Sequence, residues 1–312
     1  MIRELRRSDG PRFIELMNQN FPEENALLGN RPQEFEKVIE RAFRWDTRFL
    51  LGLLRLLGRP IVRVLVIEGD GHPVATTMLT FPAVASYVSN VVVDPAYRRR
   101  GYAKAMLEEA RRNARRNHRR YVVLDVLETN SGARALYDSV GYRPLRARTQ
   151  MVREAAASPG PSASSNAGIR PFRKTDADAL AEVARRENPP KVEEVLPTGR
   201  SAFLGFRLAN RIIASEERAW VVDRGRGPEG HVAATVSQVF EAAHLTAPVI
   251  APSVEPELAD ALVGQAVGWL AEHRAPRMLS MVADDNVRGR SALERAGFRH
   301  AFALWTLYRP VD

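Results

Sequence analysis

The chain of 312 residues contains no cysteine, which excludes a disulfide framework, a zinc–thiolate site, an iron–sulfur cluster and a cysteine nucleophile. Its 6 histidines are scattered without the spacing of metal ligands, so we expect no metal. No apolar run reaches the roughly 18 residues needed to span a bilayer, and the start, MIRELRRSDG, has charges where a secretory signal needs an apolar core. We therefore expect a cytoplasmic protein with no membrane contact.

The chain divides at a segment with the composition of a linker. Glu154 to Gly168 reads EAAASPGPSASSNAG, which is small, polar and rich in Pro and Gly. A length of 312 residues suits about two domains. We expect a domain over residues 1–153, a linker over 154–168 and a second domain over 169–312.

The two halves repeat each other in order. Ile2-Arg3 at the start of the first half has its counterpart in Ile169-Arg170. Further pairs follow in the same order: Asp9 with Asp176, Val74–Thr77 with Val232–Thr235, Asn130 with Asn286, and Gly141-Tyr142 with Gly297-Phe298. The offset drifts only from 167 to 156 residues. Two divergent copies of one domain explain this pattern.

Hydrophobic periodicity in the first half predicts alternating strands and helices. Strands are expected at Ile2–Leu5, Val62–Glu68, Val74–Phe81, Tyr87–Val93, Tyr121–Leu127 and within Tyr142–Arg153. Helices are expected at about Pro11–Asn20, Pro32–Leu57, Gly101–Asn117 and Ser131–Ser139. The middle strands suit antiparallel pairing, and the strand–helix–strand step after them suits a right-handed crossover. The fold class is α/β (α+β), with a twisted mixed sheet flanked by helices in each half.

The segment Ser89–Ala110, SNVVVDPAYRRRGYAKAMLEEA, has the features of an anion site. A β run ends at Val93, and Asp94-Pro95 stops the ladder because Pro has no N–H to donate. Three arginines and Gly101 lead into a helix, whose first N–H groups have no intrahelical partner and favour negative charge. A basic surface turn in an Arg-rich chain would have the same sequence features, so this segment alone leaves both interpretations open.

A second segment, Leu124–Tyr142, reads LDVLETNSGARALYDSVGY. Asn130 is placed to cap the helix that follows it. Tyr137 lies on an otherwise apolar helical stripe, where either a core aromatic with a locally satisfied hydroxyl or a functional hydroxyl would fit.

Together the two segments resemble the GNAT superfamily of acetyl-CoA-dependent N-acetyltransferases. Arg98-Arg99-Arg100-Gly101-Tyr102-Ala103 matches the family's acyl-CoA signature, (Arg or Gln)-x-x-Gly-x-(Gly or Ala). Asn130-x-x-Ala133-x-x-Leu136-Tyr137-x-x-x-Gly141-Tyr142 matches its second motif, and Asn130 follows Gly101 by 29 residues. The resemblance implies two tandem GNAT-like domains, of which the second is degenerate.

The resemblance also implies a role for each matched position. Backbone N–H groups from Arg98 to Ala103, with the side chains of Arg98 to Arg100, would hold the pyrophosphate of CoA. The strand edge Val91–Val93 would pair with the pantetheine arm, and Asn130 would contact that arm from the other side. Tyr137 would protonate the leaving thiolate. The implied site residues are Val91, Val93, Arg98, Arg99, Arg100, Gly101, Tyr102, Ala103, Asn130 and Tyr137.

The implied activity is transfer of an acetyl group from acetyl-CoA to an amine of a small molecule or peptide, by direct attack, in the N-terminal domain. The charge suits polyanionic CoA, because residues 1–153 carry 27 lysines and arginines against 17 acidic residues, whereas residues 154–312 carry 19 against 20. The lack of cysteine argues against an acyl group held on an enzyme thiol. The general base stays open among Ser89, Asn90, Glu128, a water relay and an amine that arrives neutral.

The second half departs from both motifs. The expected alignment places Glu255–Asp260, EPELAD, opposite Arg98–Ala103, so that carboxylates and a proline replace the arginines. Leu293 stands opposite Tyr137. We expect this domain to keep the fold without binding acyl-CoA, and to be structural or to shape the acceptor cleft.

Two other classes of function remain open. A non-catalytic acyl-CoA-binding regulatory protein would use the same loop. Nucleic-acid binding is suggested by Arg111–Arg120, RRNARRNHRR, but a solvated basic helix end is favoured because no aromatic residues interleave with the arginines. The apolar run Phe49–Leu57 fits either an acceptor pocket or packing against the second domain.

Overall fold

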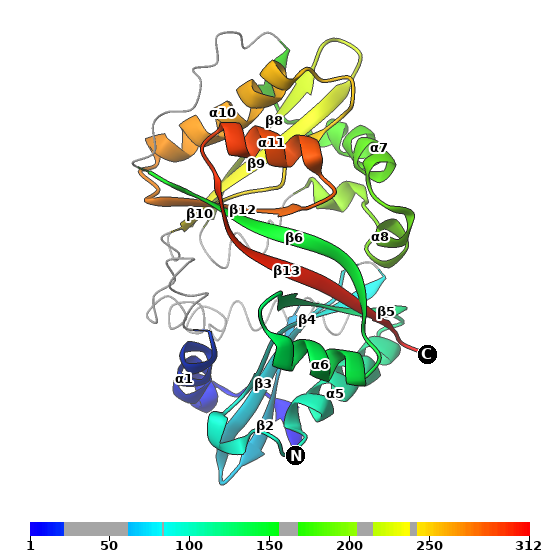
Figure 1. The fold of residues 1–312 in the computed structure, drawn as a ribbon, viewed down its shortest axis with the longest axis vertical. Helices are drawn as coiled ribbons and strands as arrows, with labels where there is room; N and C mark the ends of the chain where they lie inside the picture. The colour runs from blue at the N-terminus through cyan, green and yellow to red at the C-terminus, as the bar shows by residue number, and fades with distance from the viewer. Residues whose placement is uncertain (22–61, 83, 156–167, 205–214, 238–241) are drawn as a thin grey trace. The chain divides into compact units, whose positions relative to one another are not determined.

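The computed structural model describes residues 1–21, 62–82, 84–155, 168–204, 215–237 and 242–312, which form two compact units (Figure 1). Unit 1 comprises Met1–Leu145 with Trp305–Asp312, and unit 2 comprises Arg146–Leu304. The helix expected at Pro32–Leu57, with its apolar run, lies outside the described residues. Each unit has a mixed sheet with helices against it, so the predicted α/β class is confirmed.

The described elements of unit 1 follow the predicted order up to the helix at Ser131–Ser139, whereas the strand expected within Tyr142–Arg153 lies mainly in unit 2. They are β1 (Ile2–Glu4), α1 (Gly10–Asn20), β2 (Val62–Gly69), β3 (His72–Thr80), β4 (Ala85–Val93), the 3-10 helix η2 (Pro95–Tyr97), α5 (Tyr102–Arg116), β5 (Tyr121–Leu127), α6 (Ser131–Ser139) and the end of β13 (Arg299–Pro310). The strand order is β1-β2-β3-β4-β5-β13. The first four strands pair antiparallel, whereas β4 and β5 are parallel, as a helical crossover through α5 requires.

Helices cover both faces of the sheet of unit 1. On one face, α5 and α6 pack against it in a buried cluster that includes Met106, Leu107 and Tyr137. On the other face, α1 packs Leu16 against Val92 in a separate cluster. The neighbours of Val92 on β4 pack on the α5 cluster instead, as expected because successive strand residues point to opposite faces.

Unit 2 repeats this plan. Its elements are β6 (Arg143–Glu154, from Arg146 on), β7 (Ile169–Pro171), α7 (Ala177–Glu187), α8 (Pro190–Val195), β8 (Ser215–Asp223), β9 (Pro228–Ser237), β10 (Ala242–Leu245), β11 (Val249–Ile250), α10 (Pro256–Glu272), β12 (Arg277–Ala283), α11 (Val287–Arg295) and the start of β13. The strand order is β6-β12-β10-β9-β8-β7, with β11 beside β9. The parallel pair here is β10 with β12, the counterpart of β4 with β5.

The same ion pair and the same backbone hydrogen bond occur at equivalent places in the two units. Arg3 holds the carboxylate of Asp9 at 2.6 Å, and Arg170 holds that of Asp176 at 2.8 Å. Each carboxylate also accepts a backbone N–H three residues before it at 2.7 Å. The local structure therefore preserves the internal duplication that the sequence predicts.

The last strand of each sequence copy is shared between the units. Met151 of β6 is buried in the core of unit 2, whereas Leu307 of β13 and Val311 just beyond it are buried in the core of unit 1. The N–H of Val311 donates to the carbonyl of Arg120 at 3.0 Å, and its own carbonyl accepts from Arg111 at 2.8 Å. The C-terminus thus ends beside β5 and completes unit 1 (Figure 1). The compact units therefore divide the chain inside β6 and β13, while the expected domains at 1–153 and 169–312 remain a prediction about the two sequence copies.

Candidate functional site

β4 pairs with β5 over only part of its length. The parallel register runs from Ala85 opposite Tyr121 to Val88 opposite Leu124, although β4 continues to Val93. On its other edge, β4 remains paired with β3 as far as Val93 opposite Ala75. In the part of the chain that the structure describes, residues 89–93 have no partner strand on the β5 side. The predicted residues Val91 and Val93 lie in this segment, where an extended arm could add to the sheet.

A β-bulge lies where the pairing of β4 with β5 ends. The register of β4 with β3 shifts between Thr76 and Met78, and Asn90 adopts φ of 54°. The hydroxyl of Thr77 donates to the carbonyl of Ser89 at 3.1 Å and closes the irregular pair. Bulges re-aim a strand and are common beside active sites. Ser89 and Asn90, two of the candidate bases, belong to this bulge, whereas Glu128 is exposed in the turn after β5.

The loop after β4 presents a run of backbone donors. It passes through η2 and reaches α5 at Gly101, whose φ of 81° is a left-handed conformation that favours glycine. From Arg99 to Lys104, six consecutive N–H groups have no hydrogen-bond acceptor among the described residues. These groups form the first turn of α5 and the approach to it, where the helix dipole favours an anion. The structure therefore brings the predicted residues 98–103 together as one donor-rich turn.

Side chains on neighbouring elements fix the shape of this loop. Asp94 is buried, accepts the N–H of Ala96 at 2.8 Å and forms an ion pair with Arg12 of α1. The guanidinium of Arg100 lies 4.8 Å from the ring centre of Tyr97. Arg98 donates to the side-chain oxygen of Asn20 at 2.9 Å. Within the described chain, no carboxylate pairs with any of the three arginines at 98–100, so their charge is available to an anionic ligand.

The second motif places a buried hydroxyl on α6. Asn130 caps this helix, because its side-chain oxygen accepts the N–H of Ala133 at 3.0 Å. Tyr137 is 7% exposed, and its ring lies 5.8 Å from that of Tyr142. Burial raises the pKa of Tyr137 to about 12, so its hydroxyl stays protonated at neutral pH. Such a group can donate a proton but cannot serve as a resident base.

The equivalent loop of unit 2 differs in register from the expected alignment. The buried faces of α5 and α10 match at an offset of 156 residues, with Met106, Leu107 and Ala110 opposite Leu262, Val263 and Ala266, so Glu257 corresponds to Gly101 and Val254 to Arg98. Glu255–Asp260, expected opposite Arg98–Ala103, therefore lies one residue further along the chain than the structural equivalent of that segment, residues 254–259. Relative to the shared buried face, α10 begins at Pro256, two residues before the position that corresponds to Tyr102.

The corrected alignment still removes the anion site from unit 2. Pro256 lacks an N–H group, and the carboxylate of Glu255 stands at the helix start, paired with Arg224 at 2.8 Å. Leu293, the counterpart of Tyr137, is fully buried and has no hydroxyl.

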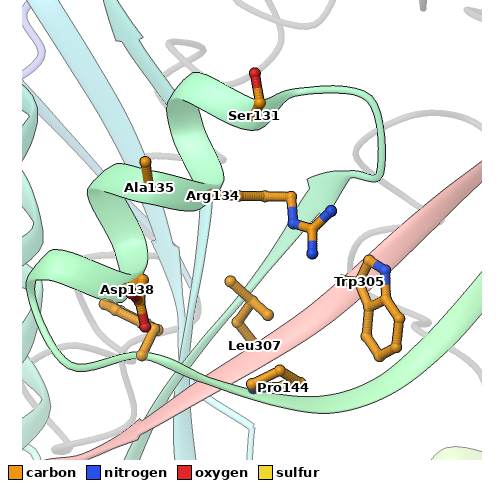
Figure 2. A pocket seen from close by; sticks show the side chains of 8 residues that line it. Ser131, Arg134, Ala135, Asp138, Pro144, Trp305 and Leu307 are labelled. Carbon is orange, nitrogen blue, oxygen red and sulfur yellow. The ribbon is translucent and has the colours of Figure 1, made fainter.

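A separate open pocket of about 480 Å³ lies on the other stripe of α6. Figure 2 shows Arg134 reaching from α6 toward Trp305 of β13, with Leu307 and Pro144 below it. On α6 the pocket is lined by one stripe of residues, namely Ser131, Arg134, Ala135 and Asp138. Tyr137 lies on the neighbouring stripe of the helix, which is buried. None of the predicted acyl-CoA residues lines this pocket.

The basic end of α5 is largely paired with acidic residues of the same helix. Arg111 contacts Glu108 at 2.7 Å, and Arg112 and Arg116 contact Glu109 at 2.8 and 3.3 Å. This pairing supports a solvated helix end over a nucleic-acid surface. Among the described residues, no group of three acidic or histidine side chains is arranged to hold a metal ion. No helix in the described ranges is long and apolar enough to cross a membrane.

Comparisons with known proteins agree with this geometry. Residues 17–142 match the acetyltransferase (GNAT) family. Comparison with curated proteins found no match. A tandem GNAT protein from the clavulanic acid biosynthesis pathway is similar in structure, with a TM-score of 0.64 and 16% identity over 100% of this chain and 98% of that one. A GCN5-related N-acetyltransferase from Sphaerobacter thermophilus has a TM-score of 0.66 and 15% identity over 100% and 96% of the two chains. Residues 17–142 are therefore similar to the GNAT family, and the chain has the fold of the tandem GNAT protein.

Proposed function

We propose that unit 1 transfers an acetyl group from acetyl-CoA to an amine acceptor by direct attack. The observation that carries this proposal is the turn from Arg99 to Lys104, with its six N–H groups that lack acceptors among the described residues. A diphosphate carries several oxygens that need such donors, and three arginines stand beside them. A basic surface turn without a ligand would not need the left-handed glycine and the buried Asp94–Arg12 pair that shape this loop.

The residues present fit the rest of acetyl-CoA. The free edge of residues 89–93 suits the amide-bearing pantetheine arm, because an extended chain can pair with it as an added strand. Asn130 uses its side-chain oxygen to cap α6, which leaves its amide N–H groups to face that arm. The arm would lead toward the divergence of β4 from β5, with Tyr137 on the helix that follows β5.

Direct attack needs a good leaving group and a nucleophilic amine. Tyr137 is held protonated by burial and can give its proton to the departing thiolate of CoA. No cysteine is present to take up the acyl group first. The amine nitrogen therefore bonds to the thioester carbon while the carbon–sulfur bond breaks.

Unit 2 is proposed to be non-catalytic. Pro256 and the Glu255 carboxylate occupy the place where unit 1 offers donors and positive charge. Its function is then to support the fold or the acceptor cleft.

Thiol release from acetyl-CoA tests the proposal, and the absence of cysteine keeps a thiol-reactive dye from labelling the protein itself. We expect release of CoA that depends on an added primary amine, with acetylated amine formed in equal amount. Tight binding of acetyl-CoA without release by any amine would instead establish a non-catalytic acyl-CoA-binding regulatory protein. Absence of both binding and release would refute the proposal.

A further inference from the structure

The open pocket beside α6 has an apolar floor. Leu307 of β13 is buried in the cluster under α5 and α6, and Trp305 packs against that cluster and is half-buried. Thr306 between them points to the other face of the sheet, where it donates to Asp125 at 2.6 Å. Pro144 of β6 completes the floor. The volume of about 480 Å³ suits a small organic molecule.

Two opposite charges on α6 complete the lining of the pocket. Arg134 and Asp138 are four residues apart, a spacing at which opposite charges on a helix often pair, but here they do not. Arg134 instead donates to the carbonyl of Glu128 at 3.3 Å, which uses only part of its set of N–H donors. In the ranges that the structure describes, no carboxylate pairs with Arg134, and the carboxylate of Asp138 has neither an ion pair nor a hydrogen bond. Figure 2 shows Leu307 between Asp138 and Trp305 in this view.

The second sequence copy has the same two charges, but there they neutralise each other. Arg290 and Glu294 of α11 follow Arg134 and Asp138 by 156 residues, which is also the offset between the two helices. The guanidinium Nε of Arg290 lies 3.1 Å from the carboxylate of Glu294. A second carboxylate, that of Asp284, lies 3.8 Å from the same guanidinium. The helix of unit 2 therefore pairs its charges, whereas that of unit 1 presents them separately.

The aromatic part of the floor is also specific to unit 1. Thr149 of β6 precedes Trp305 by the same 156 residues, and its hydroxyl donates to Asp284 at 2.8 Å. Met151 and Leu307, which correspond by the same offset, are both buried. The core residue is thus apolar in both copies, whereas the half-buried ring that lines the pocket occurs only in unit 1.

We propose that this pocket binds an α-amino acid with an apolar or aromatic side chain. Arg134 holds its carboxylate through charge-assisted hydrogen bonds, Asp138 accepts from its ammonium group, and its side chain packs on Trp305. A ligand with both charges is favoured over a simple acid or amine, because either of those would leave one charge of the pocket without a partner. The site is separate from the donor loop and does not depend on the proposed acetyl transfer.

Three probes that differ only in charge test the proposal on the full chain. L-Phenylalanine carries both charges, 3-phenylpropanoate has only the carboxylate, and 2-phenylethylamine has only the ammonium group. Their affinities are measured by calorimetry in the absence of acetyl-CoA. We expect the wild-type protein to bind phenylalanine about 10-fold more tightly than either of the other two. Glycine should bind too weakly to measure, because it has no side chain to rest on the floor.

Two substitutions separate the charges of the pocket. Arg134→Gln should lower the affinity for phenylalanine roughly 10-fold without weakening the binding of phenylethylamine. Asp138→Asn should lower it by a similar factor without weakening the binding of phenylpropanoate. Both positions are exposed, so we expect both variants to fold. Arg290→Gln and Glu294→Gln are the matched controls in unit 2, and they should bind every probe as the wild type does.

The proposal would be overturned if the wild-type protein did not bind phenylalanine at millimolar concentration, or bound all the probes equally. A loss of affinity with Arg134→Gln alone would make the pocket an acid site and not a zwitterion site. Unchanged binding by both pocket variants would place the amino acid elsewhere, for example at the acceptor site. None of these results bears on the acetyl transfer, which is tested separately by release of CoA.

Discussion

The guanidinium Nε of Arg153 donates to the carbonyl of Ala296 at 2.9 Å, against the turn that ends α11 in unit 2. Arg309, its counterpart 156 residues later, lies against the equivalent turn of unit 1, where a side chain added at Gly141 would come within 3.6 Å of its Nε. Each arginine belongs to the last strand of one sequence copy, but it lies in the unit that is formed mainly by the other copy. Neither sequence copy contains its own complete sheet.

Removal of residues 305–312 should therefore unfold unit 1, although every residue proposed to bind acetyl-CoA is retained. Leu307 and Val311 are buried there, and burial of two such side chains contributes roughly 3–6 kcal/mol. We expect loss of the unit 1 transition in calorimetry and loss of acetyl-CoA binding. Removal of Asp312 alone, which is exposed, is the control. A shortened chain that melts and binds like the full chain would contradict the exchange of strands.

Tyr137→Phe should lower kcat by roughly 10²–10³-fold with little change in the affinity for acetyl-CoA, because it removes a proton donor and keeps the ring. The pKa of about 12 means that loss of the acidic proton should not limit activity below about pH 10. Tyr142→Phe is the control, since Tyr142 is also buried and its ring contacts that of Tyr137 at a tilted angle, but it has no proposed chemical role. Equal kcat values for the Tyr137 variant and the wild type would remove Tyr137 from the reaction.

Unit 2 should lose stability as the pH falls from about 6.5 toward 4. His231 is 4% exposed between Phe172 and Phe203, and burial lowers its pKa to about 4. A histidine whose pKa is lowered on folding makes its full contribution to the stability of the folded state above its unfolded pKa. This contribution is lost as the pH falls toward 4. A shift of this size corresponds to roughly 3 kcal/mol.

His231→Asn should flatten the stability profile between pH 6.5 and pH 4, as followed by urea unfolding. His300→Gln, at an exposed position, should leave the profile unchanged. Parallel profiles for the wild type and His231→Asn would show that another group accounts for the acid sensitivity.

Local features of the fold were predictable because they depend on neighbouring residues. The helix Ser131–Ser139 has the predicted bounds, since Asn130 caps it and Gly141 follows with φ of 85°. The strand Tyr121–Leu127 likewise follows from a β-branched run between a helix end and a cap.

Features that depend on distant residues were not predictable. The strands β6 and β13 have similar alternation, so the sequence does not say which copy each one completes. Asp125 interrupts the apolar run YVVLDVL, which is a visible signal, but its partner Thr306 is 181 residues away. The start of α10 lacks a glycine, so its alignment with α5 required the observed buried faces of the two helices.

The most direct measurement is calorimetric binding of acetyl-CoA to the wild type, to Gly101→Glu and to Gly71→Glu. Both glycines have left-handed backbones, with φ of 81° and 78°, and a Cβ at either would meet open space. Each substitution should therefore cost a similar strain of about 1–2 kcal/mol, while only Gly101→Glu puts a carboxylate into the donor loop. We predict loss of measurable binding for Gly101→Glu and wild-type affinity for Gly71→Glu. Equal affinities for the two variants would contradict the assignment of this loop as the acyl-CoA site.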